Sequence, residues 1–289
     1  MKNVKTIFYL HSCFLYFYYS KQYHVLKIYR QYRKSKYVIS IIPLENYYLF
    51  KKWGINSVYF ENFLPYNYNK TIPSNLLEKK ILMIGRGRSK LKRFDLGIFS
   101  LEYIKNEIPD VKLIIISKLT GIKYLQDIIT NLNLENNVIF GKYSSDPSIY
   151  YKNASLHFLP SISEGYPLDY ISLAKNGTII IYDDTPESLA KISLKILKKR
   201  IFKKKLSKIA RLSMKKFDNE KLFNKWKLLL LSVINNYNNY SNLFEDNKNN
   251  TNELLNILKT QVFLLNKRMK YKRNITILDL EKISIQKMK

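Results

Sequence analysis

Cysteine and histidine are scarce in this sequence. Cys13 is the only cysteine among 289 residues, so no disulfide can form within the chain. The three histidines, His11, His24 and His157, show no metal-ligand spacing. We therefore expect a reducing, cytoplasmic compartment and no bound metal.

Long apolar runs are lacking as well. The stretch at residues 6–20 is apolar, but it falls short of the roughly 20 residues that a membrane-spanning helix needs. It also lacks the small-residue cleavage site of a secretory signal. We interpret it as a buried strand and helix, with a membrane segment as the alternative.

Acidic residues are few, since 22 Asp and Glu stand against 50 Lys and Arg, which gives a net charge of +28. This balance permits attraction to nucleic acid, anionic lipid or phosphorylated ligands. Basic runs at residues 27–36, 198–208 and 267–273 interleave aromatic residues, but they fall on amphipathic helices and contain no nucleic-acid-binding motif. We expect solvated faces here and disfavour nucleic acid as a partner, while peripheral contact with an anionic membrane stays open.

Apolar segments alternate in a way that predicts an α/β fold. The expected strands lie at residues 36–43, 56–62, 79–85, 111–117, 137–142, 155–160 and 178–183. Helical spacing separates most of them, at residues 45–54 and 93–107 for example, and continues from residue 185 onward. Residues 111–117 are apolar almost throughout, as in a parallel strand buried on both faces. The pattern predicts a Rossmann-like, doubly wound parallel sheet with ligands at the carboxyl ends of its strands.

Two of the eight glycines lie in one basic turn between a strand and a helix. This turn, IGRGRSKLKRFDL, covers residues 84–96. Backbone amides at a helix N-terminus, together with the cations of Arg86, Arg88 and Lys92, suit a diphosphate. Taken alone, the turn also fits an ordinary solvated loop.

A second stretch places a carboxylate at the end of another strand. SLHFLP runs into SISEGYPL, which brings Glu164 and Gly165 just before a helix. A carboxylate there can accept hydrogen bonds from sugar hydroxyls, and glycine lets a ligand approach the backbone. The alternative is that Glu164 only stabilises the helix start.

Taken in order, these stretches resemble the donor domain of GT-B glycosyltransferases, specifically glycosyltransferase family 4, also called group 1. The resembling parts are GRGRSKLKRFDL, VKLIIIS, NNVIFGKYSSDPSIYYKNASLHFLPSISEGYPL and NGTIIIYDDTPESLAKISLKILKK. The resemblance implies transfer of a sugar, with retention of configuration, from a nucleotide-diphosphate sugar such as a UDP- or GDP-sugar. It implies no cofactor beyond this donor, and it leaves the acceptor open.

The resemblance also implies three parts of the chain and a set of site residues. Residues 1–75 are expected to hold a partial N-terminal acceptor domain and a linker, residues 76–236 the nucleotide-sugar-binding domain, and residues 237–289 an Asn-rich loop and a helical tail. Arg86 and Lys92 should contact the diphosphate, and Glu164 the donor sugar. The remaining expected binding residues are Gly85 and Arg88 in the basic turn, Gly141 and Tyr143 beside the base, and Gly165, Tyr166, Pro167 and Leu168 beside the distal phosphate.

One departure from the family's pattern concerns the ribose. The family has a second glutamate eight positions after the first, whereas an ungapped count from Glu164 reaches Ser172. A gapped comparison favours an internal deletion between Leu168 and Asn176 that removes this carboxylate and one sheet strand. Non-catalytic binding of a nucleotide sugar is therefore an alternative to transfer. Asp183 and Asp184 suggest a helix start, with Asp184 as its cap, more than a metal site.

Overall fold

The computed structural model describes residues 5–11, 25–51, 53–63, 74, 76–85, 92–118, 122–144, 148–161, 177–181, 183, 185–213 and 219–235. The chain divides into two compact units. The first consists of Met1–Phe63, Ser163–Tyr166 and Asp218–Lys289, and the second of Leu64–Ile162 and Pro167–Phe217.

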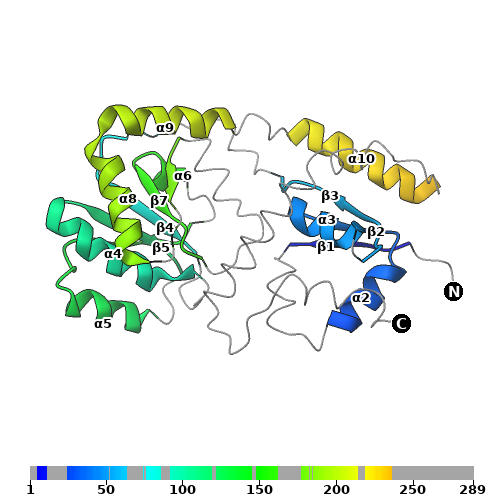
Figure 1. The fold of residues 1–289 in the computed structure, drawn as a ribbon, viewed down its shortest axis with the longest axis horizontal. Helices are drawn as coiled ribbons and strands as arrows, with labels where there is room; N and C mark the ends of the chain where they lie inside the picture. Colours follow the sequence, from blue (N-terminus) through cyan, green and yellow to red (C-terminus); the bar gives the residue numbers. More distant parts are fainter. Residues whose placement is uncertain are drawn as a thin grey trace. The chain divides into compact units, whose positions relative to one another are not determined.

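The first unit is a small parallel sheet with helices around it (Figure 1). Its elements are β1 (Ile7–Leu10), α2 (Val25–Lys34), β2 (Tyr37–Ser40), α3 (Pro43–Lys51), β3 (Ser57–Tyr59) and α10 (Asn219–Asn235). The strand order is β1-β2-β3, and both pairs are parallel. The strands expected at residues 36–43 and 56–62 are thus confirmed as β2 and β3. The strand expected within residues 6–20 is β1, which is half-buried and not buried as expected, and the helix expected after it lies outside the described residues.

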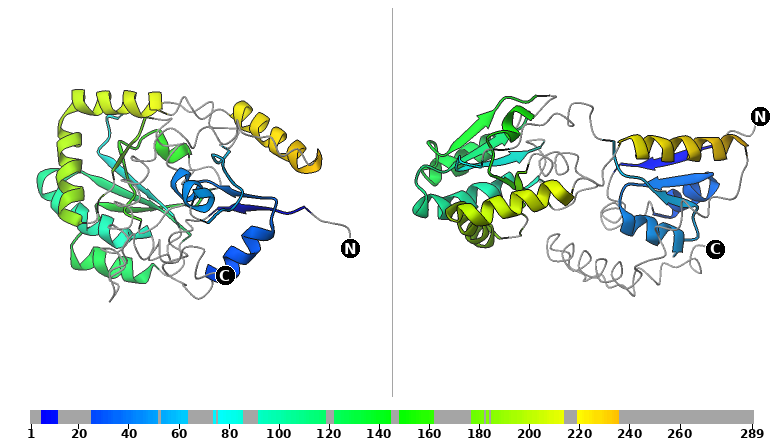
Figure 2. Two further views of the ribbon diagram at one scale, coloured as in Figure 1. Left: turned by 45° about the vertical axis from the view of Figure 1, so that its right-hand side comes forward. Right: turned by 90° about the horizontal axis from the view of Figure 1, so that it is seen from above.

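Helix α10 belongs to the first unit although it lies far from that unit's strands in the sequence. Its Leu222, Leu229 and Val233 pack against Tyr37, Ile39, Val58 and Phe60 of the sheet. Trp226 meets the rings of Phe60 at 5.0 Å and Tyr9 at 5.4 Å, centroid to centroid. Figure 2 shows α10 running alongside the three strands. The structure thus groups α10 with the first unit, whereas the sequence grouped it with the nucleotide-sugar-binding domain up to residue 236.

A lysine near the amino end of β1 reinforces this packing. Lys5 Nζ donates to the carbonyl oxygens of Val233 at 2.8 Å and Ile234 at 3.1 Å. These are among the last carbonyls of α10, which have no partner within the helix, and a cation also interacts favourably with that end of the helix dipole.

The second unit is a larger α/β layer structure. Its elements are β4 (Lys80–Ile84), α4 (Phe94–Glu107), β5 (Lys112–Ile116), α5 (Lys123–Asn131), β6 (Val138–Gly141), α6 (Ser148–Tyr151), β7 (Leu156–Phe158), β8 (Ile179–Ile181), α8 (Pro186–Lys198) and α9 (Arg200–Ser213). The five strands pair in the order β6-β5-β4-β7-β8, and every pair is parallel.

Alternate side chains of each strand point to opposite faces of this sheet. Ile81 and Met83 of β4 join a core with α4, α5 and α8, whereas Leu82 lies on the other face with Tyr151 of α6 and Ala154. Helices cover both faces, which explains why β5 is apolar almost throughout. The doubly wound α/β fold expected from the sequence is confirmed.

Strand β8 lies directly beside β7. The register pairs Leu156 with Ile179, His157 with Ile180 and Phe158 with Ile181, so no further strand separates them. Residues 178–183 were expected to match a later strand of the family, and this strand takes the position next to β7. The internal deletion expected between Leu168 and Asn176 falls on residues outside the described ones and stays a prediction.

The N-cap of helix α8 is Thr185 and not the expected Asp184. The Thr185 Oγ1 accepts a hydrogen bond from the Ser188 amide at 3.2 Å, and Pro186 occupies the first helical position. Asp183 accepts from the Thr185 amide at 3.2 Å.

None of the helices described is long and apolar enough to cross a bilayer.

Leu229→Ala should destabilise the first unit by about 2–5 kcal/mol, because it empties a fully buried site between α10 and the sheet. Trp53 and Trp226 are the two tryptophans of the chain, and both lie in this unit, so tryptophan fluorescence during urea unfolding reports on it alone. The matched control is Leu230→Ala, since Leu230 is 45% exposed. An equal loss of stability in the two variants would contradict the packing of α10 on the first sheet.

Candidate functional site

The carboxyl ends of the central strands meet at one edge of the second sheet. Gly85 follows β4, Lys118 lies two residues after β5, and β6 ends at Gly141. Because these neighbouring strands are parallel and in register, their ends share this edge. Such an edge is the usual ligand position of a doubly wound sheet.

Gly85 and Lys92, two of the expected site residues, lie in contact. The Gly85 amide donates to the Ile116 carbonyl oxygen at 3.0 Å, which extends the pairing of β4 with β5 beyond the strand. A Cβ atom added to Gly85 would lie 2.9 Å from Lys92 Cγ and 3.2 Å from Lys92 Cε. The stem of Lys92 therefore crosses directly over the glycine, and any larger residue would displace it.

Lys92 also stands at the start of α4. The cap residue Arg93 has φ 48° and ψ 51°, a left-handed conformation, and its side chain makes no capping hydrogen bond. The first-turn amides of α4 point toward this turn, where they can donate to an anion. The arrangement combines a flexible cation with a helix N-terminus at the end of β4.

Gly141 and Tyr143 occupy the same edge at the end of β6. A Cβ atom on Gly141 would clash with Ile116 Cδ1 and would lie 3.2 Å from Tyr150 Cε1. Tyr150 in turn donates from its hydroxyl to the Lys142 carbonyl oxygen at 2.9 Å. Gly141 is thus required by close packing, which fixes the path of the backbone that leads to Tyr143.

The ring of Tyr143 lies open beside a lysine that sequence reasoning missed. Tyr143 is 57% exposed, and Lys118 Nζ lies 5.2 Å from its ring centroid, within the range of a cation–π interaction. Lys118 follows the apolar run of β5 in the sequence. That position, at the carboxyl end of a buried parallel strand, is the signal that identifies it.

A buried histidine underlies the site. His157 on β7 is 1% exposed and pairs in register with Leu82 of β4. Burial, followed by the charge of Lys92, lowers its pKa to about 3, although a backbone hydrogen bond with Leu82 opposes the shift. Among the described residues, its Nδ1 has no hydrogen-bond partner. The imidazole is therefore neutral at physiological pH, and it adds no second positive charge near Lys92.

The other expected site residues lie outside the described residues: Arg86, Arg88, Glu164, Gly165, Tyr166, Pro167 and Leu168. Ser161, the last described residue before Glu164, is buried. Within the described part of the chain, no three His, Cys, Asp or Glu side chains cluster as metal ligands would.

Comparison with known proteins supports the resemblance seen in the sequence. Residues 67–187 match the model of the family Glycosyl transferases group 1. An uncharacterized glycosyltransferase of Haemophilus influenzae is 31% identical over 119 residues, which cover 40% of this chain and 33% of that protein. The similarity to group 1 glycosyltransferases is confirmed, and the match spans about a third of the length of that relative.

Solved structures share the fold. S. aureus TarM, in a complex with fondaparinux, alpha-GlcNAc-glycerol and UDP, gives a TM-score of 0.65 at 20% identity, over 79% of this chain and 51% of TarM. Anabaena HepE in complex with UDP-glucose gives 0.65 at 18% identity, over 79% of this chain and 72% of HepE. Sucrose-phosphate synthase from Thermosynechococcus elongatus gives 0.66 at 17% identity, over 80% and 68% of the two chains. These likenesses show a GT-B fold.

Arg93→Gly should raise the free energy of unfolding of the second unit by about 0.5–1 kcal/mol, because glycine adopts the left-handed conformation without strain. Arg93→Ala is the matched control, since it removes the same side chain and keeps the strain. Urea unfolding followed by circular dichroism measures both variants. An equal rise in the free energy of unfolding of both variants would show that removal of the side chain, and not relief of backbone strain, is responsible.

His157→Leu should make the second unit less sensitive to acid. The folded pKa of His157, about 3, lies below its ordinary value of 6.5, so the unfolded chain binds more protons between these values. Stability is therefore lost as pH falls below 6.5, by up to about 1.4 kcal/mol per pH unit. Urea unfolding at pH 7, 5.5 and 4.5 should show a shallower loss in the variant.

The control for this experiment is the exposed His11. His11→Gln should retain the acid sensitivity of the unmodified chain. If the free energy of unfolding falls with pH as steeply in His157→Leu as in the unmodified chain, this result would contradict a buried, neutral imidazole.

Proposed function

Because residues 67–187 match a glycosyltransferase family, we propose that this chain binds a nucleotide-diphosphate sugar at the carboxyl edge of the second sheet. The observation that carries the proposal is the passage of the Lys92 stem over Gly85 at the start of α4. It places a cation beside the N-terminus of α4, and both suit a diphosphate.

The neighbouring residues fit the two ends of such a ligand. Arg86, next to Gly85 in the sequence, adds a guanidinium for the phosphates. The exposed ring of Tyr143 and the backbone after Gly141 offer a surface for the base. Glu164, six residues after β7 in the sequence, would accept hydrogen bonds from the donor sugar. The complexes of TarM with UDP and of HepE with UDP-glucose favour uridine as the base.

The reaction that we propose is retaining transfer of the sugar to an acceptor. When the bond between the anomeric carbon and the diphosphate breaks, negative charge grows on the phosphate oxygen that leaves. Lys92 and Arg86 are the residues that we expect to stabilise this charge, because cations placed beside the leaving phosphate act electrostatically on the charge that develops there. The neutral state of His157 removes a competing positive charge beneath Lys92.

Binding without efficient transfer is the second candidate, and it is favoured by Ser172, which stands eight positions after Glu164 where the family has its second glutamate. The gapped comparison also lacks the carboxylate that holds the ribose hydroxyls in the family. Loss of charge-assisted hydrogen bonds weakens donor binding by about 2–3 kcal/mol, or roughly a hundredfold. Release of UDP in the presence of candidate acceptors distinguishes the two functions.

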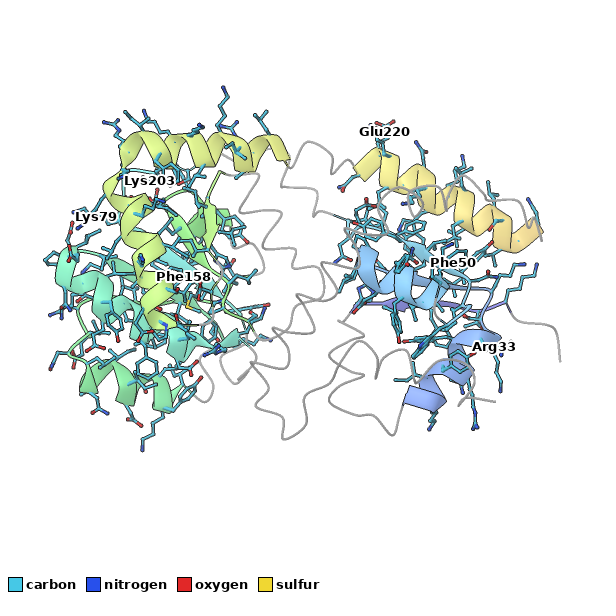
Figure 3. The ribbon with its side chains drawn as sticks, viewed as in Figure 1. Arg33, Phe50, Lys79, Phe158, Lys203 and Glu220 are labelled. Atoms are coloured by element: carbon cyan, nitrogen blue, oxygen red, sulfur yellow. The ribbon has the colours of Figure 1, made fainter. Side chains whose placement is uncertain are left out.

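Calorimetric titration of the purified chain with UDP and GDP tests the donor site. Lys92→Ala and Arg86→Ala should each weaken UDP binding by about 10- to 100-fold, because each removes a charge-assisted contact with phosphate. Lys79→Ala is the matched control. Lys79 lies before the opposite, amino end of β4 and pairs with Asp110 at 2.7 Å (Figure 3).

Two results would contradict the proposal. One is the absence of saturable binding at millimolar nucleotide. The other is an equal loss in all three variants, which would reflect the total charge of the protein and not a site. Binding that depends on Lys92 and Arg86, with no UDP release from a UDP-sugar, would support the binding function over transfer.

A further inference from the structure

Helix α9 carries a surface that the nucleotide-sugar site does not use. Residues 188–217 contain twelve Lys or Arg residues and no Asp or Glu. Basic runs on a helix are usually solvated, so the position of the apolar residues decides whether this one has a further role.

The inner side of α9 is already occupied. Phe202 and Leu206 pack against the core of the second unit, and Lys203 and Ser207 are only 5% and 8% exposed. Figure 3 shows Lys203 on the side of the helix that faces the sheet. The orientation of α9 is therefore fixed by its inner residues.

The outer side mixes cations with apolar residues. Ile201, Lys205, Lys208 and Leu212 follow one another at spacings of four, three and four residues, so they form one outward stripe. Ile201 is 86% exposed and Leu212 49%. Lys204, Ile209 and Arg211 flank this stripe and are exposed too.

No ion pair among the described residues engages the four outer cations, Lys204, Lys205, Lys208 and Arg211. All four residues are exposed. The helix as a whole has no acidic residue that would offset it.

We propose that this outer face of α9 docks the protein on an anionic lipid bilayer. Anionic headgroups complement the four cations, and Ile201 and Leu212 can enter the boundary between headgroups and acyl chains. Each lysine or arginine near such a surface strengthens partitioning about fivefold. The face carries aliphatic side chains where a single-stranded nucleic acid would need aromatic ones, since the aromatic residue of α9, Phe202, points inward.

Sedimentation with vesicles tests this proposal without any nucleotide sugar, so its result is independent of the donor site. The purified chain should bind vesicles of equal parts phosphatidylglycerol and phosphatidylcholine, and not vesicles of phosphatidylcholine alone. Lys204→Gln, Lys205→Gln and Lys208→Gln, combined, should lower the partition coefficient by about 100-fold. The matched control combines Lys79→Gln, Lys123→Gln and Lys152→Gln, which removes the same charge from exposed lysines elsewhere in the second unit.

A second variant separates the bilayer from other polyanions. Ile201→Ser with Leu212→Ser should lower vesicle binding by about tenfold, because apolar burial contributes to membrane contact. Both changes lie on the exposed face, and circular dichroism checks that the variants fold.

Three outcomes would overturn the proposal. They are equal binding to both kinds of vesicle, equal loss in the α9 variant and in its lysine control, and vesicle binding that survives the serine variant while duplex DNA or RNA competes for the chain. The last would identify α9 as a nucleic-acid surface.

Discussion

The pairing of β4 with β5 on one side and β7 on the other is the interaction on which the second unit depends. It places the end of β4 at the centre of the sheet, and it is extended by the hydrogen bond from the Gly85 amide to Ile116. This bond fixes the point where the chain leaves the strand. The Lys92 side chain lies over Gly85, so the backbone pairing that fixes this glycine also fixes the surface on which the cation's stem packs.

Much of this fold could be predicted from the sequence, since buried parallel strands leave continuous apolar runs such as residues 111–117. The boundary of the first unit could not. Helix α10 follows α9 in the chain, but Leu222, Leu229 and Val233 pack on a sheet formed more than 150 residues earlier. Helical periodicity identifies an apolar face and does not say which sheet that face covers.

The candidate site shows the same limit. Gly85 and Lys92 could be identified because a strand, a glycine and basic residues occur in order, and the structure brings the two into contact. His157 was read only as a scattered histidine, because its register beside Leu82 and its burial depend on the pairing of β7 with β4. Lys118 was missed because it follows β5 whereas Tyr143 follows β6, and only the pairing of these strands brings the two side chains together.

The contact of Lys5 with the end of α10 has a consequence for biosynthesis. Strands β1, β2 and β3 leave the ribosome early, but the helix that covers them is made roughly 160 residues after β3. At typical elongation rates of about 5–20 residues per second, the apolar face of these strands stays uncovered for about ten to thirty seconds, until α10 is synthesised. The second unit can fold during that interval. The first unit is completed last, although its strands are translated first.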